Sequence, residues 1–305
     1  MGRSSECVHF VRPLEPLRKT DQTDSKRLIG LSGDSWSDTG FNITGPLPSP
    51  NNPLGNTVFP PLNASSGAVW PVYLATQYNS SAVLTYTLAI SSSVVDKTID
   101  PQRPDLITQV QQEFLPTWGK RGNSTWQSGN TLFIVFIGIN DVGITVESNL
   151  SRSTTFDHQL SVYSNLVDQI YETGARNFLF MNVPPLDKSP MFTTNAAAGP
   201  AVVDWNTCVA KLASNLSSTY TDTTVLQFDT YNLFNQILAN VSSFPTTTQL
   251  KNTSASCPAY NWIYREMFDQ SCDVPLSQYL WMNDLHPTYP IHDTIAAQVA
   301  KQLGT

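Results

Sequence analysis

Five short apolar runs that alternate with segments of helical spacing constrain the fold of this 305-residue chain more than any other feature. The runs have the length and β-branched content of buried strands and span residues 27–32, 84–90, 131–138, 177–183 and 224–229. Apolar residues recur at helical spacing in residues 70–77, 160–171, 202–216 and 291–303. Apolar strands that alternate with helices form a parallel sheet covered on both faces. We therefore predict an α/β fold of three layers, α/β/α, with a five-stranded parallel sheet.

The organisation of the chain favours a single domain. No linker-like segment separates two cores, so we assign residues 27–305 to one domain and residues 1–26 to an N-terminal extension. This extension is charged and lacks the apolar centre of a signal peptide. Residues 41–61 are rich in Pro, Gly and Asn, and we expect them to form a functional loop over one end of the sheet. Residues 242–275 form a second irregular insertion.

The charge and hydropathy of the chain argue against two classes of partner. The net charge is −7, and no cluster of Lys and Arg stands out that could bind a phosphate backbone. The longest apolar run, residues 132–139, has about half the length that a membrane-spanning helix needs. We therefore expect neither nucleic acid nor a membrane as a partner.

The composition and the glycosylation motifs indicate secretion. Only 13% of the residues are charged, about half of the usual share. Chance would produce about 4 to 5 Asn-X-Ser/Thr motifs in this composition, whereas the chain has eight. They begin at Asn42, Asn63, Asn79, Asn123, Asn149, Asn215, Asn240 and Asn252. We expect a secreted, extracellular glycoprotein.

The four cysteines, Cys7, Cys208, Cys257 and Cys272, contain no C-x-x-C pair, so their spacing does not suggest zinc or a thioredoxin-like site. Three disulfide pairings and buried free thiols all remain open. A bridge between Cys257 and Cys272 would be the local one, and the chain-entropy model gives it about 3 kcal/mol of stabilisation. No His, Asp and Glu cluster has the spacing of metal ligands, and we expect neither a metal nor a cofactor.

The strongest motif is Gly33-Asp34-Ser35-Trp36-Ser37-Asp38-Thr39-Gly40, which follows the first predicted strand directly. Open parallel sheets bind ligands beyond the carboxyl ends of their strands, and a turn of small residues there can present a serine hydroxyl. The short G-D-S sequence alone is typical of a polar turn. The longer form G-D-S-x-[ST]-D-T-G has seven specified positions and is far more specific.

This motif, together with three further blocks, resembles the GDSL or SGNH hydrolase family. The family carries four blocks, named for Ser, Gly, Asn and His. In this chain residues 65–71 are similar to the Gly block, residues 138–141 to the Asn block and residues 286–288 to the His block. Residues 182–186 are similar to the turn that this family carries after its fourth strand. The chain looks most like the fungal secreted acetyl esterases of carbohydrate esterase family 16. The resemblance implies a flavodoxin-like SGNH hydrolase domain and a serine carboxylic-ester hydrolase.

The chemistry of acyl transfer gives each matching residue a role. Ser35 would be the nucleophile, and His286 is the natural general base. The backbone N–H groups of Ser35 and Gly67 and the side-chain amide of Asn140 would form the oxyanion hole. Gly67 suits this role because a residue without a Cβ lets the backbone approach the acyl oxygen closely.

The catalytic carboxylate is the one departure from the family pattern. The family usually carries Asp three residues before the His, but this chain has Asn283 there and Asp284 one residue later. Three interpretations remain open. A local shift could bring Asp284 to the imidazole, Asn283 could act as a neutral orienter of a Ser–His dyad, or the enzyme could be weakened. We favour Asn283 as the group beside the ring.

Other polar residues have weaker cases. His9 and His158 have no constellation around them, so we expect them to be exposed, and His292 should pack or hydrogen-bond within the last helix. For the acids next to the motifs, Asp34, Asp38 and Asp141, we expect hydrogen bonds that brace the loops.

These observations favour a monomeric extracellular esterase that removes acetyl groups from acetylated oligosaccharides, such as fragments of xylan, or from small acetyl esters. We expect Trp36, Trp70 and the loop of residues 41–61 to offer a stacking surface for a sugar ring. Two alternatives remain: a lipid or phospholipid esterase of the same family, and a catalytically impaired hydrolase scaffold that binds carbohydrate.

Overall fold

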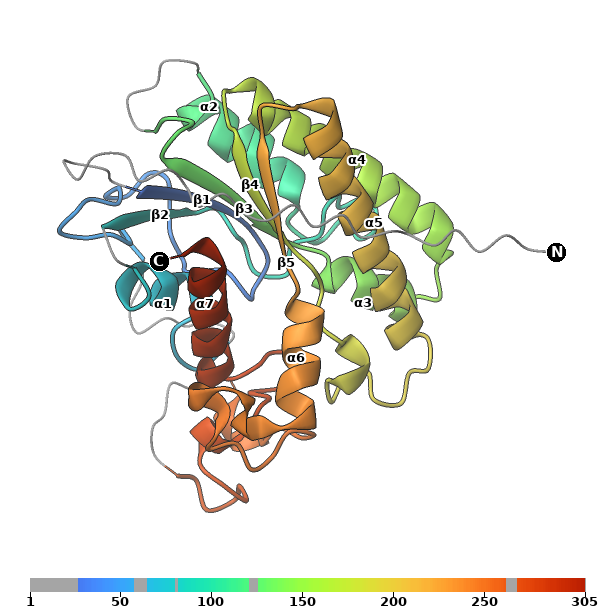
Figure 1. The fold of residues 1–305 in the computed structure, drawn as a ribbon. Coiled ribbons are helices and arrows are strands. Elements are labelled where there is room, and N and C mark those ends of the chain that lie inside the picture. Colours follow the sequence, from blue (N-terminus) through green and yellow to red (C-terminus); the bar gives the residue numbers. More distant parts are fainter. Residues whose placement is uncertain (1–26, 58–64, 80–81, 121–125, 262–267, 305) are drawn as a thin grey trace.

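The computed structural model describes residues 27–57, 65–79, 82–120, 126–261 and 268–304. Its centre is a five-stranded sheet with the strand order β2-β1-β3-β4-β5, in which every neighbouring pair is parallel (Figure 1). The strands are β1 (Arg27–Gly33), β2 (Val83–Thr87), β3 (Thr131–Phe136), β4 (Asn177–Met181) and β5 (Thr224–Phe228). The five predicted strands and their parallel arrangement are confirmed.

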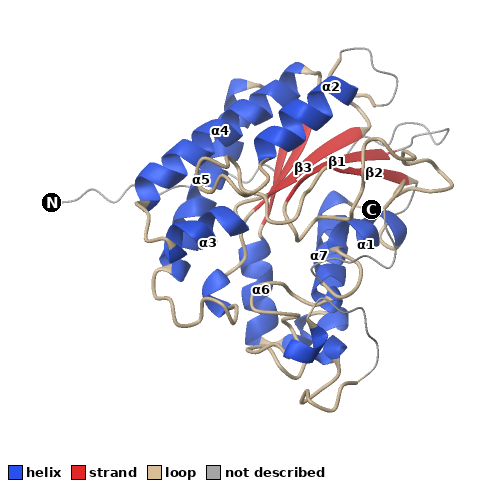
Figure 2. Ribbon diagram, turned by 180° about the vertical axis from the view of Figure 1, so that it is seen from behind, coloured by secondary structure: helices blue, strands red, loops and turns tan. Residues whose placement is uncertain are grey.

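Helices cover both faces of the sheet, so the predicted three layers are also confirmed. In Figures 1 and 2, α1 and α7 lie on one face, whereas α3, α4 and α5 lie on the other. The α-helices are α1 (Trp70–Thr76), α2 (Leu115–Trp118), α3 (Ile139–Glu147), α4 (Arg152–Glu172), α5 (Ala198–Thr219), α6 (Thr230–Ala239) and α7 (Tyr289–Leu303). A π-helix, Thr108–Phe114, leads into α2, and 3₁₀ turns span Leu186–Lys188, Val241–Ser243, Pro245–Thr247, Pro258–Tyr260 and Leu276–Gln278.

The burial of the strands follows from their place in the sheet. Phe133, Ile134, Val135 and Phe136 of the central strand β3 are all buried, because helices cover both of its faces. The edge strand β5 leaves Thr224 and Gln227 exposed. The central strands therefore carry the continuous apolar runs from which the sheet could be predicted.

The strand order determines where a site can form. The order 2-1-3-4-5 is that of flavodoxin-like folds, and the crossover direction reverses between β1 and β3. Loops that leave the carboxyl ends of two such strands diverge and open a crevice at that edge. The Ser and Asn blocks follow β1 and β3, so both begin at this point.

The later part of the second irregular insertion, together with the residues that follow it, packs into a small separate core. Cys257 and Cys272 form a disulfide, which is the local pairing among those left open by the sequence. The buried residues of this second core are Cys257, Tyr260, Cys272, Leu276, Tyr279 and Met282. Cys208 is half-buried and not part of a disulfide, and Cys7 lies outside the described residues. The small core therefore lies directly before the segment that carries His286.

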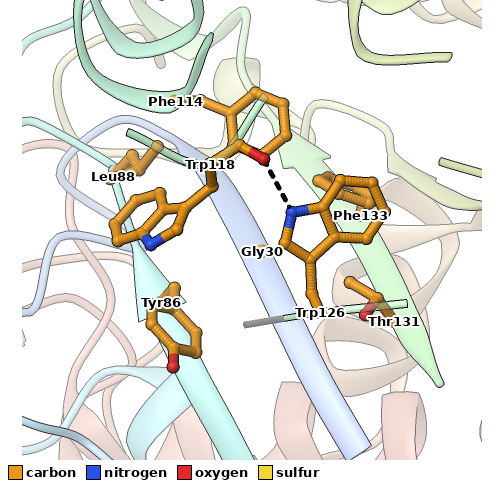
Figure 3. A pocket seen from close by; sticks show the side chains of 8 residues that line it. All are labelled: Gly30, Tyr86, Leu88, Phe114, Trp118, Trp126, Thr131 and Phe133. Atoms are coloured by element: carbon orange, nitrogen blue, oxygen red, sulfur yellow. Dashed lines mark hydrogen bonds between the residues drawn. The ribbon is translucent and has the colours of Figure 1, made fainter. Parts of the chain in front are cut away.

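An apolar cavity lies between β1, β2 and β3 on one side and the π-helix and α2 on the other (Figure 3). Its volume is about 30 Å³, which is room for one or two water molecules and too little for an organic ligand. Gly30, Tyr86, Leu88, Phe114, Trp118, Trp126, Thr131 and Phe133 line it. None of these residues belongs to the predicted site.

No helix in the described part of the chain is long and apolar enough to span a membrane.

Candidate active site

The turn after β1 presents Ser35 at the sheet edge. The N–H groups of Ser37 and Asp38 both donate to the carbonyl of Asp34 at 3.0 Å, which closes the turn around Ser35. Gly33 is needed at the entry to this turn, because a Cβ there would lie 2.5 Å from the carbonyl oxygen of Phe136 on β3. The sequence G-D-S thus allows β1 and β3 to approach closely directly behind the serine.

Three acids brace the loops around this turn, as the sequence predicts. Asp34 Oδ1 accepts from the N–H of Trp36 at 3.0 Å, and Asp141 Oδ1 accepts from that of Val95 at 3.0 Å. Asp38 Oδ1 accepts a hydrogen bond from the N–H of Gly40 at 2.8 Å. Its Oδ2 accepts from the N–H and from the hydroxyl of Ser91, at 2.8 and 2.7 Å.

Asp34 and Asp141 are fully buried, and burial raises the pKa of each carboxyl to about 7. In each of them, the second carboxyl oxygen is buried and has no hydrogen-bond partner among the described residues. A protonated carboxyl suits such a site better than a carboxylate, because burial without a partner costs most for the charged form. The serine turn and the Asn block therefore each contain a buried acid with a pKa near neutrality.

His286 contacts the predicted nucleophile. Its Nε2 lies 2.8 Å from Ser35 Oγ, and its Nδ1 lies 3.0 Å from Asn283 Oδ1. The same Asn283 oxygen also accepts from the backbone N–H groups of Leu285 and His286, at 2.9 and 2.8 Å. Two backbone donors fix the amide so that its oxygen faces the ring, and Nδ1 must then carry the proton. Nε2 is therefore the unprotonated nitrogen and can accept the proton of Ser35.

Asp284 does not reach the imidazole. Its side chain is exposed, and its backbone carbonyl accepts from Met191 N–H at 2.9 Å. Of the two candidates left open by the sequence, the structure thus places Asn283 beside the ring. Burial lowers the pKa of His286 to about 4, and the neutral Asn283 amide supplies no negative charge that would raise it.

The Gly block is packed against the His block. A Cβ on Gly67 would lie 2.6 Å from Cβ of Tyr289, which begins α7 three residues after His286. The N–H of Tyr289 donates to the carbonyl of Ser65 at 3.1 Å. Ser66, between them, has a φ of 53°, a left-handed conformation that costs a non-glycine residue about 1 kcal/mol or more. Gly67 is therefore held within van der Waals distance of the first turn of α7.

A second link joins the Gly block to the serine turn. Trp70 Nε1, at the start of α1, donates to Ser37 Oγ at 3.0 Å. Among the described residues, no group accepts a hydrogen bond from the backbone N–H of Ser35 or of Gly67. Both groups are thus available at the same edge of the sheet.

Asn140 lies in the first turn of α3, just beyond the carboxyl end of β3. Gly138 precedes this helix with a φ of 121°, where a Cβ would lie 2.2 Å from Trp205 Nε1. The Asn140 amide is held at both ends: its Nδ2 donates to the carbonyl of Ser93 at 2.9 Å, and its Oδ1 accepts from Arg103 Nη1 at 3.2 Å. One Nδ2 hydrogen remains for another acceptor.

Gln109, on the π-helix, is a supporting residue that no sequence motif indicates. It is fully buried, and its amide oxygen and nitrogen pair with the N–H and carbonyl of Gly33 at 2.9 and 2.8 Å. Its Nε2 also donates to Ser93 Oγ at 3.0 Å. Because the Ser93 carbonyl binds Asn140, one glutamine supports both the serine turn and the Asn block.

The expectation that Trp36 and Trp70 offer a stacking surface for a sugar is wrong. Both side chains are 0% exposed. The Trp36 ring is directed inward, where its centroid lies 6.0 Å from that of Phe136 and 5.6 Å from that of Phe234. The described part of the loop predicted at residues 41–61 ends at residue 57.

The remaining histidines differ in part from expectation. His292, in α7, packs against Trp36, as predicted. Neither of its ring nitrogens has a hydrogen-bond partner among the described residues. Burial lowers its pKa to about 3. His158 is exposed over about half of its side chain but is not isolated, because its Nε2 lies 2.8 Å from Asp96 Oδ2. His9 lies outside the described residues, as do the glycosylation motifs at Asn63 and Asn123.

Within the described ranges, no group of three or more His, Cys, Asp or Glu side chains is arranged to hold a metal ion.

Comparisons with known proteins found a matching family, similar sequences and a similar fold. A family model described as GDSL-like lipase/acylhydrolase matches residues 29–297. An acetylesterase of Thermothelomyces thermophilus is 31% identical over 301 residues, which cover 93% of this chain and 90% of that protein. An acetylesterase of Hypocrea jecorina is 26% identical and covers 52% of this chain and 48% of the relative. A crystal structure of an acetylxylan esterase from Geobacillus stearothermophilus has the same fold, with a TM-score of 0.52 at 15% identity over 92% of this chain and 95% of that one.

Proposed function

This chain belongs to the GDSL-like lipase/acylhydrolase family of carboxylic-ester hydrolases, and we propose that it cleaves acetyl esters with Ser35 as its nucleophile. The observation that carries the proposal is the chain of hydrogen bonds from Ser35 Oγ through His286 to Asn283. A serine hydroxyl is a weak nucleophile on its own and needs a base within hydrogen-bond reach. His286 provides that base at 2.8 Å, in the tautomer that can accept the proton.

The proposed reaction has two acyl-transfer steps. Ser35 Oγ attacks the ester carbonyl while Nε2 of His286 takes its proton, and the carbonyl oxygen becomes an oxyanion. The N–H groups of Ser35 and Gly67 and the free N–H of the Asn140 amide stabilise that charge. The bond to the leaving alcohol then breaks, His286 protonates that alcohol, and an acetyl group remains on Ser35. A water molecule gives a proton to Nε2 of His286 and attacks this acetyl group. The bond to Ser35 Oγ breaks, His286 returns the proton to Oγ, and acetate is released.

The neutral Asn283 bears on which esters can react. It orients the imidazole as a carboxylate would, but it does not stabilise the imidazolium that forms during proton transfer. With the pKa of His286 held at about 4, His286 is a weak base that remains unprotonated in mildly acidic solution. This combination suits acetyl esters, whose cleavage is easier than that of amides.

The finer substrate assignment rests on similarity. The relative from Thermothelomyces thermophilus is an acetylesterase, and we propose that this chain acts outside the cell on acetylated xylo-oligosaccharides or similar small acetyl esters. The disulfide between Cys257 and Cys272 supports an oxidising compartment. A lipid esterase is the rival within the family. Faster cleavage of p-nitrophenyl octanoate than of p-nitrophenyl acetate would favour that rival.

The experiment compares the wild-type protein with Ser35→Ala on p-nitrophenyl acetate and on acetylated xylo-oligosaccharides. Removing the nucleophile should abolish acetate release and leave the circular dichroism spectrum unchanged, since no hydrogen bond of Ser35 Oγ other than that to His286 is seen among the described residues. Ser161→Ala, which changes an exposed serine of α4 outside the site, is the control and should retain turnover. A fully active Ser35→Ala protein, or an inactive but folded wild type that only binds sugar, would refute the proposal.

A further inference from the structure

Arg103 lies one hydrogen bond away from the amide that we assign to the oxyanion hole. Its Nη1 donates to Asn140 Oδ1 at 3.2 Å, and its Nε donates to Asp100 Oδ2 at 3.0 Å. About 30% of the Arg103 side chain is exposed. A guanidinium is rigid and planar, so the bond to Asp100 also fixes the direction in which Nη1 points.

The orientation of the Asn140 amide decides whether it can stabilise an oxyanion. An amide has a donor end and an acceptor end, and a flipped Asn140 would present its oxygen where a donor is required. Arg103 on one side accepts no hydrogen bond, so it admits only the oxygen of Asn140. The carbonyl of Ser93 on the other side, 2.9 Å from Nδ2, admits only the nitrogen. Together they leave the second Nδ2 hydrogen free for the reacting oxygen.

Both partners of Asn140 come from one loop between β2 and the π-helix. Ser92 has a φ of 68°, which turns the backbone so that the next carbonyl, that of Ser93, is directed at Asn140. The two arms of the loop are joined by the bonds from Val94 N–H to the Pro104 carbonyl, at 3.1 Å, and from Leu106 N–H to the Val94 carbonyl, at 2.9 Å. The loop therefore holds the amide from two sides as a single unit.

The charge of Arg103 strengthens the same contact. A cationic donor on the carbonyl end of an amide polarises it and makes its N–H groups better donors. Asp100 lies against the guanidinium, so its charge offsets that of Arg103 at a distance. The effect on the reaction must then come through the directed hydrogen bond to Asn140 rather than through a long-range field.

We propose that Arg103 is a positioning residue, which holds the Asn140 amide in the one orientation that can donate to the oxyanion of an acyl-transfer transition state. This inference rests on the proposed function. It concerns a contact that forms with the transition state, so it predicts an effect on kcat with little change in KM.

The experiment is a double-mutant cycle with Arg103→Met and Asn140→Ala on p-nitrophenyl acetate. Arg103→Met should lower kcat about tenfold, which is less than the 10²–10³-fold loss that removing an oxyanion donor causes. In the Asn140→Ala protein, the same change should lower kcat by less than about twofold, because the amide through which Arg103 acts is gone. Arg103→Lys should keep more activity than Arg103→Met.

The matched control is Lys97→Met, which removes another cation from the same loop. Lys97 lies 3.8 Å from Asp105 and is half exposed, so its loss should leave kcat unchanged. A second measurement avoids turnover altogether: Arg103→Met should weaken inhibition by methylboronic acid about as much as it lowers kcat, because the boronate adduct of serine imitates the tetrahedral intermediate.

The outcomes separate this inference from the proposed function. Equal losses from Arg103→Met with and without Asn140, or an unchanged kcat, would overturn the positioning role while Ser35-dependent hydrolysis stands. A wild-type protein without Ser35-dependent hydrolysis would refute the proposed function, and the role of Arg103 with it.

Discussion

Asn283 holds the imidazole of His286 without adding a charge to it. Its oxygen accepts three hydrogen bonds, from the N–H groups of Leu285 and His286 and from the ring nitrogen Nδ1. Orientation and charge are usually supplied together by a carboxylate. In this chain they are separated, so a substitution at this residue can measure the contribution of the charge alone.

The substitution Asn283→Asp should raise kcat/KM for acetyl esters at least about tenfold, within the roughly 10⁴-fold span known for the reverse change in a serine protease. The carboxylate would favour the protonated ring and raise the pKa of His286 from about 4. Because the base acts when unprotonated, the acid limb of the pH profile of kcat/KM should lie near pH 4 in the wild type and at higher pH in the variant.

Asp284→Ala is the control for that substitution and should change little, since its side chain is exposed. The account of Asn283 would be wrong if Asn283→Asp were inert and Asp284→Ala lost several orders of magnitude in kcat/KM.

At the scale of elements, the five strands could be predicted because buried parallel strands are apolar along their whole length. The predicted strand ends differ from the observed ones by at most three residues, as where the run 84–90 becomes β2 (Val83–Thr87). The motif blocks could be placed at one sheet edge because the carboxyl ends of parallel strands share an edge. Ser35 and Asn140 follow two such strands, which are neighbours in the sheet.

The supporting elements could not be predicted, because their sequences carry no periodicity or motif. Gln109 lies in a π-helix, and Arg103 lies between two prolines in an irregular loop. Their importance comes from hydrogen bonds to residues distant in sequence, Gly33 and Asn140. The position of Trp36 beside the nucleophile suggests an exposed side chain, but its ring packs inward against Phe234 of α6.

At the scale of the whole molecule, four groups in or near the site have shifted pKa values, and the shifts of the histidines are opposite in direction to those of the acids. The pKa values of His286 and His292 are about 4 and 3, below their ordinary value of 6.5. Those of Asp34 and Asp141 are about 7, above their ordinary value of 3.8. The two histidines favour folding above pH 6.5 and lose that contribution as the pH falls to 4 and below. The two acids favour folding below pH 3.8 and lose it as the pH rises through 7.

These contributions offset one another between about pH 4 and 6.5. The unfolded chain binds protons on the two histidines, and the folded chain binds them on the two acids. We therefore expect these four groups to leave the free energy of unfolding nearly independent of pH in this range. Asp34→Asn removes one acid, and the free energy of unfolding should then rise with pH, by at most about 1.4 kcal/mol per pH unit.

Urea unfolding at several pH values between 4 and 6.5 measures this slope for the wild type and Asp34→Asn. The exposed Asp284→Asn is the control and should keep the wild-type slope. Identical slopes for the wild type and Asp34→Asn would show that Asp34 is already ionised in the folded protein.

The central claim is that Ser35, activated by His286, forms a covalent bond to the acyl group. The most direct measurement is labelling of the wild-type protein with a p-nitrophenyl phosphonate, followed by peptide mapping in a mass spectrometer. We expect one phosphonyl group per chain on Ser35, with esterase activity lost in proportion, and no label at that peptide in Ser35→Ala. An enzyme that stays active after exposure to the reagent, or one that is inactivated by a label on a different residue, would contradict the account.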